Sequence, residues 1–264
     1  HLQMASFSFD VFSGDWVRAL CSGAKLVLCP RDLLLEPKKL YQLMCDEEID
    51  SAEFVPAVLK NLVQYLASTQ QNLHFLKLLV VGSDILYVRE FEQFGRVCGV
   101  ETRLINSYGV TEATIDSTYF ESTTVELASE GVIPIGRPFG NVQVYILDNQ
   151  LQSVAIGVPG ELHLGGLGMS RGYLNRSDLT QEKFISHPFD PAQKLYKTGD
   201  MARYLPDGNI EFLGRIDNQV KVRGFRIEVG EVEAVLVSQP QVKDAVVIAR
   251  KERSDNKYLA AYIV

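Results

Sequence analysis

Two hydrophobic patterns alternate in the first part of the chain. Short, nearly continuous apolar runs predict four buried strands, at residues 24–30, 51–57, 75–83 and 102–106. Between them lie patterns of helical period, which predict helices at residues 37–49, 58–68 and 87–99. Strands that alternate with helices in this way are typical of a parallel sheet covered by helices. The predicted fold class for this part is therefore α/β.

From about residue 132 the pattern changes to short strands of period two separated by turns, at 142–148, 160–166, 195–205 and 208–215. This predicts a β-meander or small barrel beside the parallel sheet. After Gly214 come a charged hairpin and then a helix, a strand, a polar turn and a last strand, at 229–239, 242–250, 251–257 and 258–264. They predict the start of a small α+β subdomain. The predicted domains are an α/β core, a β subdomain, and a hinge with a partial C-terminal subdomain, at 1–128, 129–216 and 217–264.

Composition and charge argue against several classes of protein. The formal net charge of −7 argues against a nucleic-acid partner, which usually needs a basic face. No apolar run approaches the roughly 20 residues of a membrane span, so no membrane partner is expected. The first residues do not form a signal peptide. The four cysteines lack zinc-type spacing, which favours reduced thiols in a cytoplasmic protein.

Two polar loops follow predicted strands, at residues 81–84 and 106–116. Ligands of α/β sheets bind at the carboxyl ends of strands, so these loops are candidates for a binding site. The longer loop combines the ring of Tyr108 with hydroxyls and carboxylates, a set that suits a nucleotide and magnesium. The alternative is a polar turn capped by Asn106 and Gly109.

A third candidate is Asp200, which follows Gly199 in a strand of the β subdomain. A carboxylate there could accept hydrogen bonds from both hydroxyls of a ribose. The alternative is an ordinary aspartate in a hairpin turn. The glycine-rich segment 165–172 lacks the Lys-Ser/Thr ending of a P-loop, and its glycines indicate tight packing instead.

Five segments together resemble the adenylation domain of nonribosomal peptide synthetases, in the adenylate-forming superfamily. They are FSFDVFSGDW, NSYGVTEATID, GELHLGGLGMSRGYL, YKTGDMARYLPDG and GRIDNQVKVRGFRIEVGEVEAVL, beginning at residues 7, 106, 160, 196 and 214. Their order and spacing match the family over essentially the whole chain. The family motif usually has proline where this chain has Val110, which removes one fixed φ angle from the loop.

The resemblance implies an amino-acid-activating ligase. An amino acid would react with Mg-ATP to give aminoacyl-AMP, and the aminoacyl group would pass to the phosphopantetheine thiol of a peptidyl carrier protein. A condensation domain is an expected neighbour. By matching motif, Thr111 and Glu112 are the catalytic pair, with Thr111 on phosphate and Glu112 on Mg²⁺. The implied ATP-binding residues are Gly82, Ser83, Asn106, Tyr108, Thr111, Asp200 and Arg215, with Tyr108 on adenine and Asp200 on ribose, helped by Arg215.

The resemblance also implies the residues of an amino-acid pocket, in which Asp10 would bind the substrate's α-ammonium. They are Asp10, Val11, Gly14, Glu53, Leu79, Val81, Ser107, Ile115 and Asp116. Glu53 and Asp116 would then face the substrate side chain, and a carboxylate in an apolar pocket needs a cation beside it. This predicts a long basic substrate such as ornithine, lysine or arginine. The alternative is that Glu53 faces solvent or pairs with a neighbouring lysine or arginine.

In this family Asp217 would be the hinge between a large and a small part, in a stretch of opposed charges. The alternative for those charges is a solvated edge that prevents strand-to-strand association. The family's phosphate-wrapping loop and its catalytic lysine find no match, so we expect part of a longer domain with little activity alone. An acyl- or aryl-CoA ligase is disfavoured by Asp10. A non-catalytic remnant that binds nucleotide or docks partners stays open.

Overall fold

The computed structural model describes residues 1–121, 130–222, 224–251 and 257–264. Residues 252–256 of the predicted turn at 251–257, the predicted boundary at 128/129 and Arg223 lie outside the described residues. The chain divides into two compact units, His1–Gly214 and Arg215–Val264.

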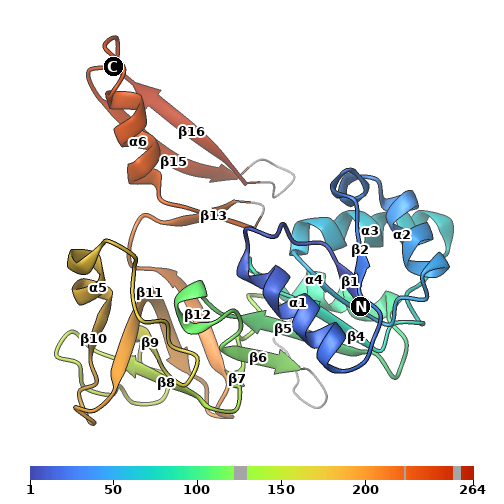
Figure 1. Ribbon diagram of the computed structural model, residues 1–264, viewed down its shortest axis with the longest axis horizontal. Helices are drawn as coiled ribbons and strands as arrows, with labels where there is room; N and C mark the ends of the chain where they lie inside the picture. The colour runs from blue at the N-terminus through green and yellow to red at the C-terminus, as the bar shows by residue number, and fades with distance from the viewer. Residues whose placement is uncertain (122–129, 223, 252–256) are drawn as a thin grey trace. The chain divides into compact units, whose positions relative to one another are not determined.

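A seven-stranded sheet forms the α/β part of the first unit (Figure 1). Its strands, in spatial order, are β2 (Val27–Leu28), β1 (Leu2–Gln3), β3 (Ser51–Phe54), β4 (Leu78–Val81), β5 (Arg103–Tyr108), β6 (Thr118–Glu121) and β7 (Arg137–Pro138). The pairings from β2 to β5 are parallel, as the apolar runs predicted for β2, β3, β4 and β5, whereas β1 was not predicted. β6 and β7 add an antiparallel edge that the strand pattern did not predict.

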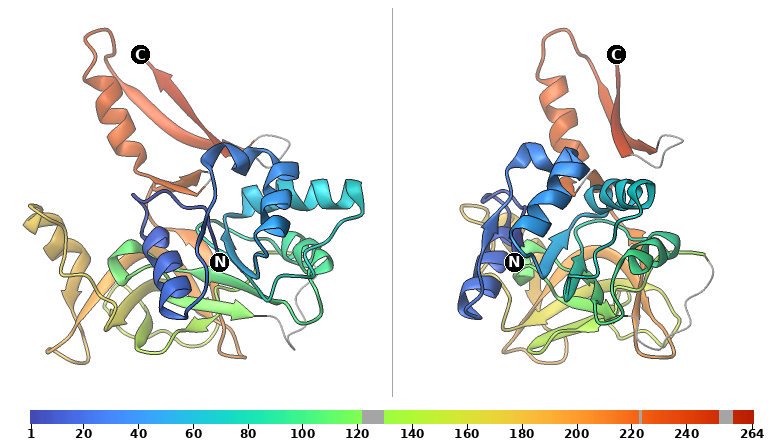
Figure 2. Two further views of the ribbon diagram at one scale, coloured as in Figure 1. Left: turned by 45° about the vertical axis from the view of Figure 1, so that its right-hand side comes forward. Right: turned by 90° about the vertical axis from the view of Figure 1, so that its right-hand side faces the viewer.

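Helices flank this sheet, as further views show (Figure 2). They are α1 (Asp10–Cys21), α2 (Pro37–Asp46), α3 (Pro56–Thr69) and α4 (Val88–Val97), with short 3₁₀ helices η1 (Arg31–Leu35) and η2 (Thr111–Ala113). Helix α1 was not predicted, because its start carries an aromatic residue, Phe9, with no side-chain cap. Among the described residues no helix is long and apolar enough to cross a membrane.

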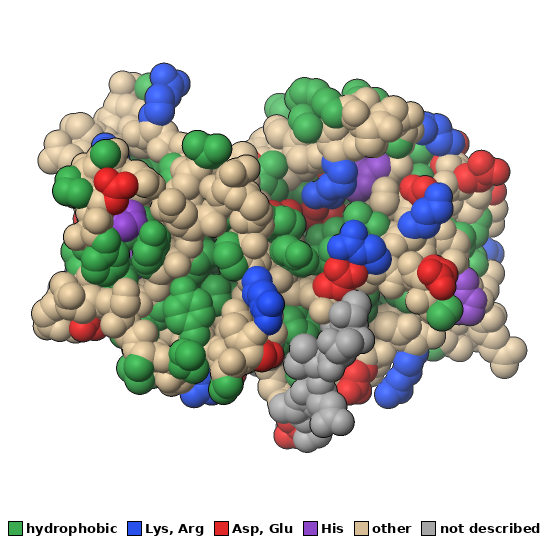
Figure 3. Space-filling view, turned by 90° about the horizontal axis from the view of Figure 1, so that it is seen from below, with side chains coloured by type: hydrophobic (Ala, Val, Ile, Leu, Met, Phe, Trp, Pro, Cys, Tyr) green, Lys and Arg blue, Asp and Glu red, His purple; other side chains and the backbone are tan. Residues whose placement is uncertain are grey.

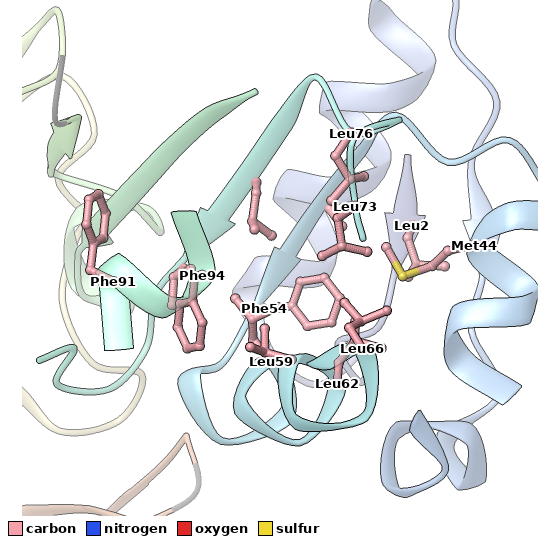
Figure 4. Close-up of a cluster of buried hydrophobic side chains, with 14 of the residues drawn as sticks. Leu2, Met44, Phe54, Leu59, Leu62, Leu66, Leu73, Leu76, Phe91 and Phe94 are labelled. Carbon is pink, nitrogen blue, oxygen red and sulfur yellow. The ribbon is translucent and has the colours of Figure 1, made fainter. Parts of the chain in front are cut away.

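The main apolar core lies between the sheet and helices α2, α3 and α4. Leu59, Leu62 and Leu66 recur at helical spacing on α3, and Figure 4 shows them beside Phe54 of β3. All three leucines are fully buried, and each contributes roughly 1.5–3 kcal/mol relative to an exposed side chain. Pro56 begins α3 at a position where the missing N–H costs no hydrogen bond.

A five-stranded antiparallel sheet forms the rest of the first unit. Its strands are β8 (Val142–Leu147), β9 (Gly160–Gly166), β10 (Phe184–Ser186), β11 (Lys194–Tyr204) and β12 (Ile210–Arg215), and helix α5 (Ser177–Lys183) precedes β10. The order is β10-β11-β9-β8, with β12 also paired to β11. Hydrophobic side chains gather over this part on the face in Figure 3, whereas charges of both signs lie side by side on the α/β part.

The second unit is a small α+β structure, as predicted from its pattern. Its elements are β13 (Val220–Val222), β14 (Phe225–Ile227), α6 (Val229–Val237), β15 (Ala245–Lys251) and β16 (Lys257–Ile263). β13 pairs with β14 and β15 with β16, both antiparallel. Glu233 of α6 accepts a hydrogen bond from the Val247 amide of β15 at 2.7 Å, which fixes the helix to the hairpin.

Candidate active site

The two predicted loops meet at the carboxyl ends of β4 and β5. Val81 pairs with Asn106 in parallel register, so the next residues, Gly82 and Ser107, are neighbours. A Cβ atom on Gly82 would lie 2.5 Å from Ser107 Oγ, so a larger residue would displace the Ser107 hydroxyl. Glycine at position 82 therefore leaves the Ser107 hydroxyl in place, and Ser83 beside it takes the left-handed conformation, with φ of 67°.

Tyr108 and Asp200 are joined although they lie 92 positions apart in sequence. The Tyr108 hydroxyl donates to Asp200 Oδ2 at 2.5 Å, and both residues are buried. The register of β9 and β11 shifts between Lys197 and Met201, around Gly199 with φ of 72°. A bulge of this kind re-aims a side chain, and here it turns Asp200 toward the end of β5.

Glu112 is held by a tyrosine that the sequence reasoning did not include in the site. The Tyr173 hydroxyl donates to Glu112 Oε1 at 2.6 Å and lies 3.2 Å from the Tyr196 hydroxyl. Burial raises the pKa of Tyr173, and its bonds to Glu112 and Tyr196 add to the effect. Tyr173 stands in the glycine-rich motif GMSRGYL, whose glycines indicated tight packing. The same motif could have indicated Tyr173 as a residue of the site.

The glycine-rich segment packs directly on the loop that carries Glu112. The Ser170 amide donates to the Glu112 carbonyl at 2.9 Å, and Thr114 Oγ1 donates to the Gly168 carbonyl at 2.5 Å. A Cβ on Gly168 would lie 3.0 Å from the Ala113 carbonyl oxygen. These contacts agree with tight packing as the reason for the glycines. Thr111, in the same loop, is exposed.

Glu112 fits a magnesium ion bound jointly with phosphates. Mg²⁺ is commonly held by one or two carboxylates together with substrate phosphates and water. In the described part of the chain no group of three His, Cys, Asp or Glu side chains could form a metal cage. The buried carboxylate of Glu112 next to the exposed hydroxyl of Thr111 suits the shared arrangement.

Asn106 has a structural hydrogen bond. Its Nδ2 donates to the Pro134 carbonyl at 2.9 Å, and the side chain is buried. Side chains alternate across a strand, so Asn106 lies on the sheet face opposite Ser107. The structure therefore uses this amide to fasten β5 to the segment before β7.

Helix α1 presents three of its residues along one face. Asp10, Gly14 and Arg18 are four residues apart, which places them one above another. A Cβ on Gly14 would lie 3.1 Å from Ile115 Cδ1, so the loop of Ile115 covers this part of the helix. Val11, next to Asp10, is half-buried.

Arg18 brings the predicted pocket carboxylates together, although sequence reasoning did not select it. Its two terminal nitrogens donate to Glu53 Oε2 at 3.1 and 3.2 Å. It also lies 3.9 Å from Asp116 Oδ2 and 3.5 Å from Asp15 Oδ1. The pairing of Glu53 with a neighbouring arginine is the alternative that the sequence left open. The signal in the sequence was the spacing of eight residues from Asp10, two helical steps along one face.

Burial raises the pKa of each carboxyl group in this cluster. The pKa of Asp15 rises to about 7, with Arg18 opposing the effect. Burial also raises the pKa of Glu53, the charge of Asp116 adds to it, and Arg18 opposes it. For Asp116, burial again raises the pKa, while the Ser107 hydroxyl near it and Arg18 act in the opposite direction. One arginine thus stands among two buried acids, Asp15 and Glu53, and the half-buried Asp116.

Leu79 and Val81 lie apart from this cluster. They are in register with Ala52 and Phe54 of β3 and belong to the apolar core beneath α2–α4. Glu53 is in register with Val80, so Val80 shares its sheet face. The structure therefore does not bring Leu79 and Val81 to the carboxylates.

Arg215 and Asp217 belong to the second unit. Arg215 donates two hydrogen bonds to the Asp217 carboxylate, each of 2.6 Å, and Asp217 also accepts from the Gln219 amide at 3.1 Å. The pair closes a local turn immediately after the boundary between the two units.

Comparisons with known proteins agree with this geometry. The AMP-binding enzyme family matches residues 1–174. Gramicidin S synthase 2 of Brevibacillus brevis is 48% identical over 263 residues, which is 100% of this chain and 6% of that protein. Tyrocidine synthase 3 of Brevibacillus parabrevis is 46% identical over 263 residues, again 100% of this chain and 4% of that protein.

Solved structures give the same result. Holo-PA1221, which contains adenylation and PCP domains and is bound to a vinylsulfonamide inhibitor, matches with a TM-score of 0.88 and 31% identity. That match covers 99% of this chain and 45% of the other. The four-domain synthetase holo-AB3403, bound to AMP and glycine, matches with a TM-score of 0.73 and 33% identity, over 99% of this chain and 19% of the other.

The chain therefore belongs to the AMP-binding enzyme family. Within that family its relatives are nonribosomal peptide synthetases, and the resemblance to their adenylation domains is confirmed. The chain spans only 4–6% of the length of the first curated relatives it matches.

Proposed function

We propose that the chain takes part in activating an amino acid as an aminoacyl-adenylate, formed with Mg-ATP, and in transferring it to the phosphopantetheine thiol of a carrier protein. The observation that supports this most is the Tyr108–Asp200 pair, because it sets a ring at the end of β5 beside a buried carboxylate of β11. The carboxylate suits ribose hydroxyls, and the ring suits adenine.

The residues around Glu112 would hold the phosphate end of the nucleotide. Glu112 would hold Mg²⁺, which when bound offsets phosphate charge. Tyr173 keeps the Glu112 carboxylate in one orientation through its 2.6 Å hydrogen bond. Thr111 is exposed beside it and would donate to a phosphate oxygen. Gly82 and Ser83 would let the backbone approach the adenine.

The substrate proposed for this site is a long basic amino acid such as ornithine, lysine or arginine. Asp10 would bind the α-ammonium at one end of the α1 face. At the other end Asp15, Glu53 and Asp116 surround Arg18, so the acids outnumber the arginine. A cationic substrate side chain would offset part of the remaining negative charge.

Two further parts of the proposal concern partners and motion. A peptidyl carrier protein and a condensation domain are proposed neighbours, since relatives include proteins with adenylation and PCP domains. Asp217 is proposed as the hinge about which the second unit would move between the two half-reactions, since it follows the boundary between the units at Gly214.

The experiment that tests the reaction is amino-acid-dependent ATP–pyrophosphate exchange on the full-length protein, with Asp200→Ala and Asp178→Ala compared. Asp178 is an exposed carboxylate on α5 that pairs with Arg176, so it controls for loss of charge alone. We expect Asp200→Ala to weaken ATP binding tenfold or more, since hydrogen bonds to a charged group contribute about 1.5–3 kcal/mol each. Equal ATP affinity in the two variants would exclude the ribose role.

A further inference from the structure

Glu53 uses its two carboxylate oxygens differently. Both terminal nitrogens of the Arg18 guanidinium donate to Oε2. Oε1 instead lies toward β4, 3.6 Å from the position that a Cβ on Gly82 would take. The same position is 2.5 Å from Ser107 Oγ, so Gly82, Ser107 and Oε1 of Glu53 border one small region.

Ser107 gives an independent sign that this region receives a ligand. Its hydroxyl oxygen is buried and forms no hydrogen bond of normal geometry within the part of the chain that the structure describes, although it lies near enough to Asp116 to lower the pKa of that carboxyl. A buried hydroxyl without a well-formed hydrogen bond costs about 1–3 kcal/mol, and a water, an ion or a ligand that supplies the missing bond removes this cost. A cationic group donating to Ser107 Oγ and Glu53 Oε1 would satisfy both.

The charges of the cluster do not balance. Arg18 makes its close ion pair with Glu53, and its nitrogens lie farther from Asp116, at 3.9 Å, and from Asp15, at 3.5 Å. Asp15 has a second neighbour in His1, whose Nε2 lies 2.7 Å from Oδ1. Asp116 is therefore the acid with the weakest pairing to a cation. In a buried site one such charge is a strong determinant of what binds.

We propose that Arg18 is a specificity-determining residue: it offsets one of the carboxylates around it, and the negative charge left at Glu53 and Asp116 selects a single cation on the substrate side chain. The inference rests on the proposed amino-acid activation and deepens it. Asp10 and Arg18 are eight residues apart on α1, about 12 Å along the helix axis, so a side chain that reaches from one end toward the other must be long.

The test is a set of charge-changing variants in the full-length protein: Arg18→Met, Arg18→Lys, Glu53→Gln and the double variant Arg18→Met/Glu53→Gln. Pyrophosphate exchange gives kcat/KM for ornithine, lysine and leucine. Glu53→Gln removes one acid and should lower the ornithine-to-leucine ratio about tenfold or more. Arg18→Met removes the cation and should raise that ratio about tenfold. The double variant should return to within about threefold of the wild-type ratio, and Arg18→Lys should stay close to it.

The outcomes test the role of Arg18, the substrate class and the reaction separately. If Arg18→Met lowers kcat/KM for all three amino acids by one common factor, Arg18 is structural and the inference is wrong. If Arg18→Met does not fold, the double variant and Arg18→Lys decide, because an unrestored ratio in the first or a tenfold change in the second overturns the inference. If the wild type exchanges with leucine better than with ornithine and lysine, the proposed substrate class fails, and the inference with it. If the wild type exchanges with no amino acid, the proposed reaction itself fails.

Discussion

The hydrogen bond from Tyr108 to Asp200 connects the two sheets of the first unit, and its loss has a size that the structure sets. Tyr108→Phe removes only the hydroxyl, and the ring stays available to stack on a base. The donor and acceptor are both buried, the acceptor is a carboxylate, and the O···O distance is 2.5 Å. A hydrogen bond to a charged group contributes about 1.5–3 kcal/mol, against about 0.5–1.5 kcal/mol for a neutral pair.

A matched control lies in the same part of the chain. The Tyr204 hydroxyl donates to the neutral carbonyl of Val144 at 3.1 Å, so Tyr204→Phe removes the same atom from a weaker bond. For a unit of this size, 1 kcal/mol shifts the Tm by roughly 2–4 °C. We therefore expect Tyr108→Phe to lower the Tm by about 3–12 °C at neutral pH, and Tyr204→Phe to lower it by less.

Thermal unfolding followed by circular dichroism measures both variants, and isothermal titration with ATP measures the site. Because Tyr108→Phe keeps the ring, its ATP affinity should fall less than that of Asp200→Ala. The reasoning is refuted if Tyr108→Phe costs no more stability than Tyr204→Phe, since the charged acceptor would then add nothing.

Two other predictions concern pH and the boundary between the units. Burial raises the pKa of Asp15 from 3.8 to about 7, so the unfolded chain ionises first and the native state loses stability as pH rises between those values. Asp15→Asn escapes this loss, so its Tm advantage over wild type should be small at pH 5 and largest at pH 8. The corresponding gain in the free energy of unfolding has an upper limit of about 4 kcal/mol. A Tm advantage independent of pH would contradict the prediction. Asp217→Pro should slow thioester formation more than adenylate formation, because proline fixes φ near −65°. Asp217→Ala, which loses the same bonds to Arg215 without that constraint, is the control, and equal effects of the two variants on both steps would exclude a hinge.

The sequence alone determined most of the elements. The strands β3, β4 and β5 and the helices α2 and α3 follow from apolar periodicity, because that pattern reports which side of an element is buried. The motifs around Glu112 and Asp200 could also be identified from sequence, since these short polar segments resemble those of a known family. The sequence motifs alone therefore identify the family correctly.

Local pattern was less informative about short or uncapped elements. Helix α1 begins after Phe9 with no side-chain cap, and β10 has only three residues, so neither carries a strong local signal. The antiparallel edge formed by β6 and β7 depends on pairing with β5, a contact that periodicity does not encode.

Only the tertiary structure decided which polar groups meet. Tyr108 and Asp200 are 92 positions apart, and Arg18 and Glu53 are 35 apart. The first pairing joins β5 to β11 near the register shift of β11, and the second joins α1 to β3. Strand register likewise placed Leu79 and Val81 in the core, away from Glu53. Charge balance in a buried site depends on distances of a few ångströms, because the interaction of two charges rises steeply as they leave water, and a linear pattern of residues contains no such distances.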